Sequence, residues 1–180
     1  SIYSANSQTI YPPVNVQQFG AKEWINQENG IVCIGRIDKT KKIHSNILVV
    51  DQLIERGHKI HLHIIGPTTD SGYCDQIEEM ARARPYVHLE GAVPRDEMIE
   101  MVDSHKYGIH GKENEHFGIA VAEMVAAKTI PLVPDGGGQA EIVKGIDELR
   151  YTNRRDAITK FERIVSDEEL QQRILQTLSD

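Results

Sequence analysis

The sequence predicts an α/β fold built around an open parallel sheet, and three observations support this prediction. From Gly30 onward, short apolar runs alternate with amphipathic helical stretches, and few residues lie between them. The chain has 180 residues, which is about one domain by the usual range of roughly 100 to 200 residues. Hydrophobic residues make up 39% and charged residues 26% of the chain, as in a globular domain and unlike a disordered or fibrous chain.

Short apolar runs define the strands of the predicted sheet. The predicted strands cover residues 31–34, 60–65, 86–89, 107–110 and 130–133, with an edge strand over 149–151. Helices separate them, which is the βαβα pattern of a parallel sheet.

Apolar residues at helical spacing predict the intervening helices. Ile47, Val50 and Leu53 recur on one face of the first helix, which ends at Gly57. Further helices are predicted within 74–85, 98–102, 117–127 and 139–143, and two more around 157–165 and 166–178. Ser166-Asp-Glu-Glu169 matches a capping box, which predicts that Ser166 starts the last helix. Residues 1–29 are interpreted as an extended lead-in or inter-domain segment, and residues 30–180 as the domain itself.

Charge and hydrophobic patterning exclude several classes of function. The formal net charge of −7 repels nucleic-acid backbones, so no nucleic-acid partner is expected. No apolar run reaches the roughly 18 residues that a membrane span needs. The first residues lack the basic region and apolar core of a signal peptide, and Cys33 and Cys74 do not suggest a disulfide. A cytoplasmic location is therefore expected.

Glycines follow the predicted strands at what would be one rim of the sheet. Ligands of open parallel sheets bind beyond the carboxyl ends of the strands. Gly35, Gly66, Gly91, Gly111 and the triplet 136–138 each follow a predicted strand. Because glycine lets the backbone approach a ligand closely, this rim is the predicted binding edge.

Two of these loops suit phosphate. The loop 35–42 is the most basic segment of the chain, and its Arg36 and Lys41 are expected to converge on a diphosphate. The loop 111–118 leads into a helix whose first-turn amides would form an anion site, with Gly118 permitting close approach.

One glutamate, Glu115, lies in the second loop, and another, Glu123, lies in the predicted helix that follows it. Glu115 and Glu123 would lie roughly 12 Å apart if both were helical, a span that suits a nucleotide sugar. One carboxylate would accept hydrogen bonds from the sugar hydroxyls and the other from the ribose. Glu123 interrupts an apolar stretch, so it needs a partner if it is buried.

These elements, in this order, resemble a known family. They are similar to the C-terminal, donor-binding domain of family 4 (group 1) retaining glycosyltransferases. The matching motifs are Gly35-Arg36 with Lys41, Ile64-Ile65-Gly66, Val87 to Gly91, Glu115 to Gly118 with Glu123, and Gly136 to Val143. The similarity covers about residues 10–145, and Tyr11-Pro12-Pro13-Val14 resembles the entry to that domain. It implies a doubly wound, Rossmann-like domain that is one half of a GT-B fold. The run 116–119 resembles the mannosyltransferase branches.

The resemblance implies a role for each matching residue. Arg36, Lys41 and Glu115 would be catalytic: the two cations would stabilise the donor diphosphate and the charge on the leaving group, and Glu115 would contact the sugar. Glu123 would hold the ribose. The remaining donor-binding positions are Gly35, Gly66, Gly91, Val93, His116, Phe117, Gly118 and Ile119, with the loop from Gly91 to Pro94 touching the base.

The resemblance also implies substrates and partners. GDP-mannose would be the donor, and a glycan or lipid-linked glycan the acceptor, bound by an N-terminal domain of the same protein. A lipid-linked acceptor would bring the full-length enzyme to the cytoplasmic face of a membrane. No Asp-x-Asp sequence occurs in the chain, so neither a metal nor another cofactor is expected.

Some positions depart from the family pattern, and other functions stay open. Glycine is common in the family at the positions of His116 and Lys128, and Pro-Ser is common at the position of Gly111-Lys112. A GT-B-like nucleotide-sugar epimerase and a non-catalytic nucleotide-binding α/β module are the alternatives, whereas a dinucleotide-dependent oxidoreductase would need Gly-x-Gly-x-x-Gly after its first strand. His61 and His63 point to one face of a strand, but no third metal ligand is evident, so a packed or solvated pair is expected.

Overall fold

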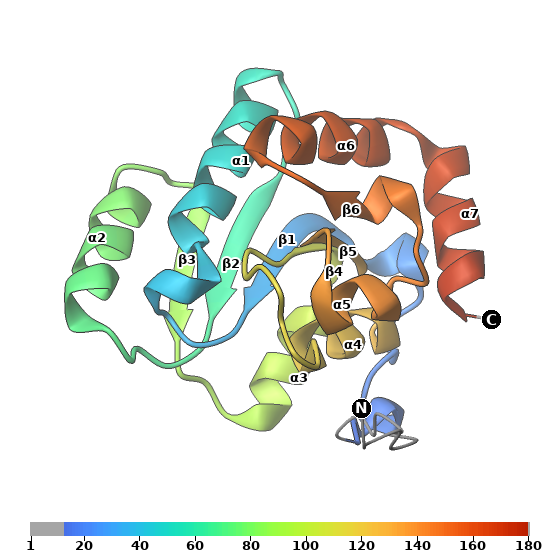
Figure 1. Ribbon diagram of the computed structural model, residues 1–180, viewed down its shortest axis with the longest axis horizontal. Coiled ribbons are helices and arrows are strands. Elements are labelled where there is room, and N and C mark those ends of the chain that lie inside the picture. Colours follow the sequence, from blue (N-terminus) through green and yellow to red (C-terminus); the bar gives the residue numbers. More distant parts are fainter. Residues whose placement is uncertain (1–12, 180) are drawn as a thin grey trace, which may run out of the picture.

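The computed structural model describes residues 13–179, which form a six-stranded parallel sheet with helices on both faces (Figure 1). The strands are β1 (Glu28–Ile34), β2 (His61–Ile65), β3 (Val87–Gly91), β4 (His105–Ile109), β5 (Ile130–Pro134) and β6 (Arg150–Tyr151). Their order is β3-β2-β1-β4-β5-β6, and every neighbouring pair is parallel. The strand order reverses between β1 and β4, so the predicted doubly wound, Rossmann-like fold is confirmed.

Helices connect the strands wherever the apolar spacing predicts them. The α-helices are α1 (Ile43–Glu55), α2 (Ser71–Arg82), α3 (Arg95–Asp103), α4 (Ile119–Ala126), α5 (Gly137–Ile142), α6 (Arg154–Ser166) and α7 (Glu168–Ser179). Short 3-10 helices are η1 (Val16–Gln18), η2 (Trp24–Asn26), η3 (Lys39–Lys41) and η4 (Asp147–Leu149). None of the helices within residues 13–179 combines the length and apolarity that crossing a membrane requires.

The alternation of side chains on β1 divides the core between the two faces of the sheet. Ile31 and Cys33 belong to the larger core, which includes residues of α1, α2, α6 and α7. Val32, between them, belongs to a smaller core with Met98 of α3 and Met124 of α4. Because successive strand residues point to opposite faces, one short apolar run contributes to both cores. Figure 1 accordingly shows α1 and α6 on one side of the sheet and α3 and α4 on the other.

The segment before β1 packs on this domain. Phe19 is 8% exposed and belongs to the smaller core. The buried carboxylate of Asp103 accepts hydrogen bonds from the backbone N–H groups of Gly20 and Ala21, at 2.9 and 3.0 Å. From Phe19 onward the segment interpreted as a lead-in thus contributes to the core, and β1 already begins at Glu28. Tyr11 and Pro12 of the entry motif lie outside the described residues.

Two helices begin later than the sequence predicts. α4 starts at Ile119 rather than at residue 117, because Gly118 has a φ of 70° and this left-handed backbone cannot continue a right-handed helix. The predicted capping box at Ser166 is wrong, since α6 continues to Ser166. The carboxylate of Asp167 caps α7 instead, accepting the N–H of Leu170 at 2.9 Å.

Candidate functional site

The loops after the strands meet at one edge of the sheet, because all of the strands are parallel. The loops after β1 and β2 touch through their backbones. A Cβ atom placed on Gly66 would lie 2.1 Å from the carbonyl oxygen of Gly35, so no larger residue fits there without moving one loop. Gly91 joins this edge from β3, and its carbonyl accepts the N–H of Gly66 at 2.8 Å.

A cavity of about 500 Å³ opens beside these loops. Four predicted site residues line it, namely Gly35, Arg36, Gly66 and Val93. The rest of its wall is mostly apolar and consists of Ile34, Ile65, Pro67, Ala92 and Met98, with Arg95 as a second cation. A largely apolar cavity with a few charged groups suits a ring system such as a nucleobase.

An ion pair between Lys41 and Glu115 joins the loops after β1 and β4, at the point where the strand order reverses. Lys41 Nζ lies 2.9 Å from Glu115 Oε2, and Lys112 Nζ lies 3.2 Å from Glu115 Oε1. Burial by itself would raise the pKa of Glu115, but the hydrogen bonds and charges of Lys41 and then Lys112 outweigh it and lower the pKa to about 2. The carboxylate is therefore ionised at neutral pH, between two ammonium groups.

Lys41 lies against Gly35, which lines the cavity, and Arg36 lines the cavity itself. A Cβ atom on Gly35 would lie 3.7 Å from Lys41 Nζ, so the ammonium borders the same loop that lines the cavity. The Arg36 side chain is 61% exposed, and its Nε lies 3.8 Å from the carboxylate of Asp38. The two cations predicted to converge thus have separate carboxylate partners.

His110 approaches the ion pair from the end of β4. It is 2% exposed, and its Nε2 lies 3.8 Å from Glu115 Oε2 with no hydrogen-bond partner among the described residues. Burial, together with the charge of Lys41, lowers the pKa of His110 to about 4, although Glu115 opposes this shift. His110 is not among the predicted site residues, and its position at the end of the predicted strand 107–110 is the one signal that the sequence offers.

Glu123 is buried on α4 and has the partner that its apolar surroundings require. It is 6% exposed, and its Oε1 accepts a hydrogen bond from Arg95 Nη1 at 2.6 Å. Arg95 also lines the cavity, so it connects Glu123 to that wall. Arg95 is not among the predicted site residues, because α3 and α4 come together only in the folded chain.

The segment from Glu115 to Ile119 packs against the start of α5. The backbone N–H of Gly138 donates to the carbonyl of Glu115 at 2.7 Å, and a Cβ atom on Gly138 would lie 2.7 Å from the carbonyl oxygen of His116. Phe117 and Ile119 are 45% and 44% exposed, and His116 is exposed beside them. Glu115 precedes α4 rather than lying in it, so the separation of roughly 12 Å that assumes one helix does not apply.

One group of side chains in the described part of the chain has the arrangement of a metal site. One ring nitrogen from each of His61, His63 and His105 lies within 4.8 Å of the other two. The expectation that no third ligand accompanies His61 and His63 is therefore wrong. His61 and His105 are the first residues of β2 and β4, so the group lies toward the amino ends of the strands, away from the rim that carries Lys41 and Glu115.

Known proteins with similar sequences are glycosyltransferases. A sequence profile of the family described as "Glycosyl transferases group 1" matches residues 16–177. The chain is 29% identical over 174 residues to the GDP-Man:Man(3)GlcNAc(2)-PP-Dol alpha-1,2-mannosyltransferase of Xenopus laevis, covering 88% of this chain and 35% of that protein. It is 26% identical over 144 residues to the Homo sapiens protein of the same name, covering 72% and 29%. The chain thus spans about a third of the length of these curated relatives.

Solved structures share the fold. WaaG, a glycosyltransferase involved in lipopolysaccharide biosynthesis, matches with a TM-score of 0.76 at 15% identity, over 95% of this chain and 50% of that one. The C-terminal domain of a glycosyl transferase group 1 family protein (LpcC) from Francisella tularensis matches with a TM-score of 0.69 at 20% identity, over 92% and 90%. At such identities the likeness concerns the fold alone, and it is the fold of one half of a GT-B glycosyltransferase. Since the family profile spans residues 16–177, the chain belongs to the group 1 glycosyl transferases.

Proposed function

We propose that this chain is the donor-binding half of a retaining mannosyltransferase and that its donor is GDP-mannose. The observation that carries the proposal is the Lys41–Glu115 ion pair at the switch point of the sheet. Its Lys41 lies against Gly35, which lines a cavity together with Arg36 and Val93. A nucleotide sugar needs an apolar site for the base, cations for the diphosphate and a carboxylate for sugar hydroxyls. The described rim has a mostly apolar cavity, the cations of Arg36 and Lys41 and the carboxylate of Glu115, which supports the proposal.

Each part of the donor has a proposed position. The cavity receives the nucleoside, with Val93 at the base and Glu123 at the ribose once Arg95 releases its carboxylate. Arg36 and Lys41 bind the diphosphate, together with the amides around Gly118, and offset the charge that develops on the leaving group. Glu115 accepts hydrogen bonds from the sugar, with His116, Phe117 and Ile119 beside it. Because Arg36 and Lys41 offset the charge of the diphosphate, the proposed donor site needs no metal and no other cofactor.

The acceptor is proposed from the relatives. Their names describe transfer of mannose to Man(3)GlcNAc(2)-PP-Dol, a glycan linked to a lipid. We infer a lipid-linked glycan acceptor, bound by an N-terminal domain of the same protein at the cytoplasmic face of a membrane.

Nucleotide binding is the first test. GDP and GDP-mannose are each expected to raise the melting temperature of the chain, and by the same amount with and without EDTA. At a concentration of about 100 Kd the expected rise is about 5 to 10 °C for a domain of this size. UDP-glucose and NAD are the comparison ligands in the same thermal-shift assay. A strict requirement for Mg²⁺ or Mn²⁺ would contradict the metal-free site, and a preference for NAD would contradict the whole proposal.

Two glutamate variants separate nucleoside recognition from sugar recognition. Glu123→Ala is expected to weaken both GDP and GDP-mannose, whereas Glu115→Ala should remove only the gain contributed by mannose. Each loss should be about 1.5 to 3 kcal/mol, as for a hydrogen bond to a charged group. GDP affinity should survive in Glu115→Ala, because Lys41 loses a carboxylate but stays available to phosphate.

Calorimetric titration of both ligands into both variants measures this difference. Glu113→Ala is the matched control, since Glu113 lies in the same loop but pairs with Lys42 at the surface. If the two variants lose the same free energy with GDP as with GDP-mannose, the assignment of sugar and ribose carboxylates is incorrect.

A further inference from the structure

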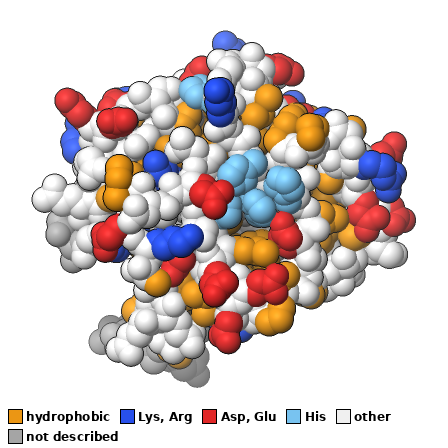
Figure 2. All heavy atoms as spheres, turned by 180° about the vertical axis from the view of Figure 1, so that it is seen from behind, with side chains coloured by type: hydrophobic (Ala, Val, Ile, Leu, Met, Phe, Trp, Pro, Cys, Tyr) orange, Lys and Arg blue, Asp and Glu red, His pale blue; other side chains and the backbone are white. Residues whose placement is uncertain are grey.

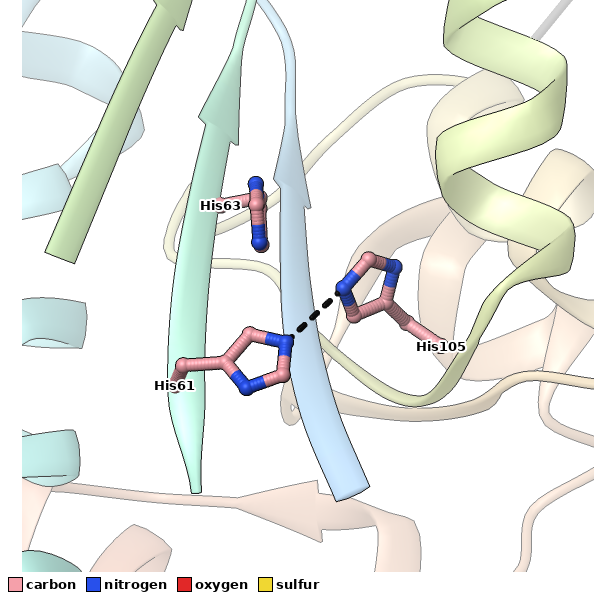
Figure 3. Close-up of side chains that lie close together, drawn as sticks. All are labelled: His61, His63 and His105. Atoms are coloured by element: carbon pink, nitrogen blue, oxygen red, sulfur yellow. Dashed lines mark hydrogen bonds between the residues drawn. The ribbon is translucent and has the colours of Figure 1, made fainter. Parts of the chain in front are cut away.

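Histidines gather on one face of the sheet, outside the proposed donor site. Figure 2 shows them as a single patch with carboxylates at its border. His61 and His63 come from β2 and His105 from β4, and Figure 3 shows the His61 and His105 rings meeting over β1, the strand between them. His63 and His105 have ring centroids 4.7 Å apart, and the rings of His61 and His105 are 5.1 Å apart.

Gly30 makes this meeting possible. Gly30 is paired with His61 in the β1–β2 register and lies on β1, the strand between the rings of His61 and His105. A Cβ atom at this position would lie 2.3 Å from His61 Nε2 and 2.3 Å from His105 Cδ2. The absence of a side chain on β1 therefore leaves the space in which imidazoles from β2 and β4 come together.

The nitrogens of His61 and His105 have the spacing of metal ligands. Their Nε2 atoms lie 3.0 Å apart. With Zn–N distances of about 2.0 to 2.1 Å, two ligands of a tetrahedral site are about 3.3 to 3.4 Å apart, so little movement would be needed. His63 brings a third nitrogen within 4.8 Å of both. Its side chain is 20% exposed, and its ring stacks on that of His88 with the ring centroids 4.7 Å apart.

In His63 and His105, the second ring nitrogen, Nδ1, has the kind of partner that orients a metal-binding histidine. His63 Nδ1 lies 2.7 Å from Glu90 Oε1, and His105 Nδ1 lies 2.5 Å from the carbonyl oxygen of Met101. Metal-bound histidines almost always donate their second N–H to a carboxylate or a carbonyl in this way. In both residues this bond leaves Nε2 as the nitrogen with a lone pair to share.

We propose that His61, His63 and His105 bind one Zn²⁺ ion, with a solvent molecule in the fourth position. Three neutral imidazoles suit late first-row divalent cations rather than Mg²⁺ or Ca²⁺. The side chains of His61 and His63 are 27% and 20% exposed, so an ion can enter from solvent while His105, 4% exposed, forms the floor. The ion would tie β2 to β4 across β1.

Zinc titration of the tag-free, metal-stripped chain tests this site. The expected result is one Zn²⁺ per chain by calorimetry, no binding of Mg²⁺, and the visible absorption of tetrahedral Co²⁺ when cobalt replaces zinc. His61→Gln should lower zinc affinity by more than about 100-fold. Glu90→Ala should lower it by about 10- to 100-fold, as is usual for the loss of a group that orients a ligand.

Two further variants distinguish zinc binding at this site from non-specific zinc binding by other histidines of the chain. Gly30→Ala retains every imidazole but fills the space between them, and it should lose zinc as His61→Gln does. His58→Gln removes a histidine that contacts Glu162 elsewhere, and it should bind zinc like the wild type. Thermal unfolding without metal shows that each variant is folded. Absence of zinc binding by the wild type, or equal affinity in wild type, His61→Gln and Gly30→Ala, would overturn the proposal and leave a hydrogen-bonded histidine cluster.

Discussion

The 180-residue chain on its own is expected to bind GDP-mannose without transferring mannose to an acceptor. It contains one Rossmann-like domain, and in the function proposed above the acceptor is bound by an N-terminal domain of the same protein. Without that domain nothing positions an acceptor hydroxyl at the anomeric carbon, and such positioning accounts for roughly 7 to 11 kcal/mol of a barrier. Water would also reach the leaving diphosphate, so the attraction of Arg36 and Lys41 would be weakened by a higher dielectric.

Release of GDP from GDP-mannose in the presence of a lipid-linked oligosaccharide measures the transfer. The assay compares the 180-residue chain with a protein in which an N-terminal acceptor-binding domain precedes it. GDP-mannose binding by both proteins is the control for an intact donor site. Comparable turnover by the two proteins would mean that residues 1–180 contain the whole active site, which contradicts the assignment of a donor-binding half.

Lys41→Ala is expected to reduce transfer by the two-domain enzyme by about 100- to 1,000-fold, the usual effect of removing one group that stabilises charge in the transition state. Lys41 is the only described lysine that both contacts Glu115 and borders the Gly35 loop beside the cavity. Its loss should reduce kcat more than GDP affinity, because the charge on the diphosphate is greatest as the sugar departs. The pKa of Glu115 should rise from about 2, since Lys41 makes the largest contribution that lowers it.

Lys42→Ala is the matched control for this variant. Lys42 is the next residue, but its side chain is 42% exposed and it pairs with Glu113 at the surface. It should retain nearly the full rate, because an exposed ion pair contributes little. Equal rates for wild type, Lys41→Ala and Lys42→Ala would remove Lys41 from the mechanism.

The sequence alone was sufficient for the strands and α-helices of this fold, though not for its short 3-10 helices, and for the edge of the sheet where the proposed site lies. Apolar periodicity is a local property, so runs such as 31–34 and spacings such as Ile47, Val50 and Leu53 identify strands and helices without knowledge of their neighbours. The βαβα order implies parallel strands, and parallel strands bring all their carboxyl ends to one rim. The ends of the elements do not follow from periodicity. Serine and aspartate are both good N-caps, and only the structure distinguishes Asp167 from Ser166 at α7.

Contacts between elements were decided by the tertiary structure. Arg95 and Glu123 are 28 residues apart, and Lys41 and Glu115 are 74 apart, so their pairing depends on how α3 meets α4 and how two rim loops meet. His61 and His105 lie on strands that are not neighbours in the sheet, and they meet only because β1 between them carries Gly30 at the point of crossing. Strand order and register determine such contacts, and neither leaves a periodic signal in the sequence around the residues concerned.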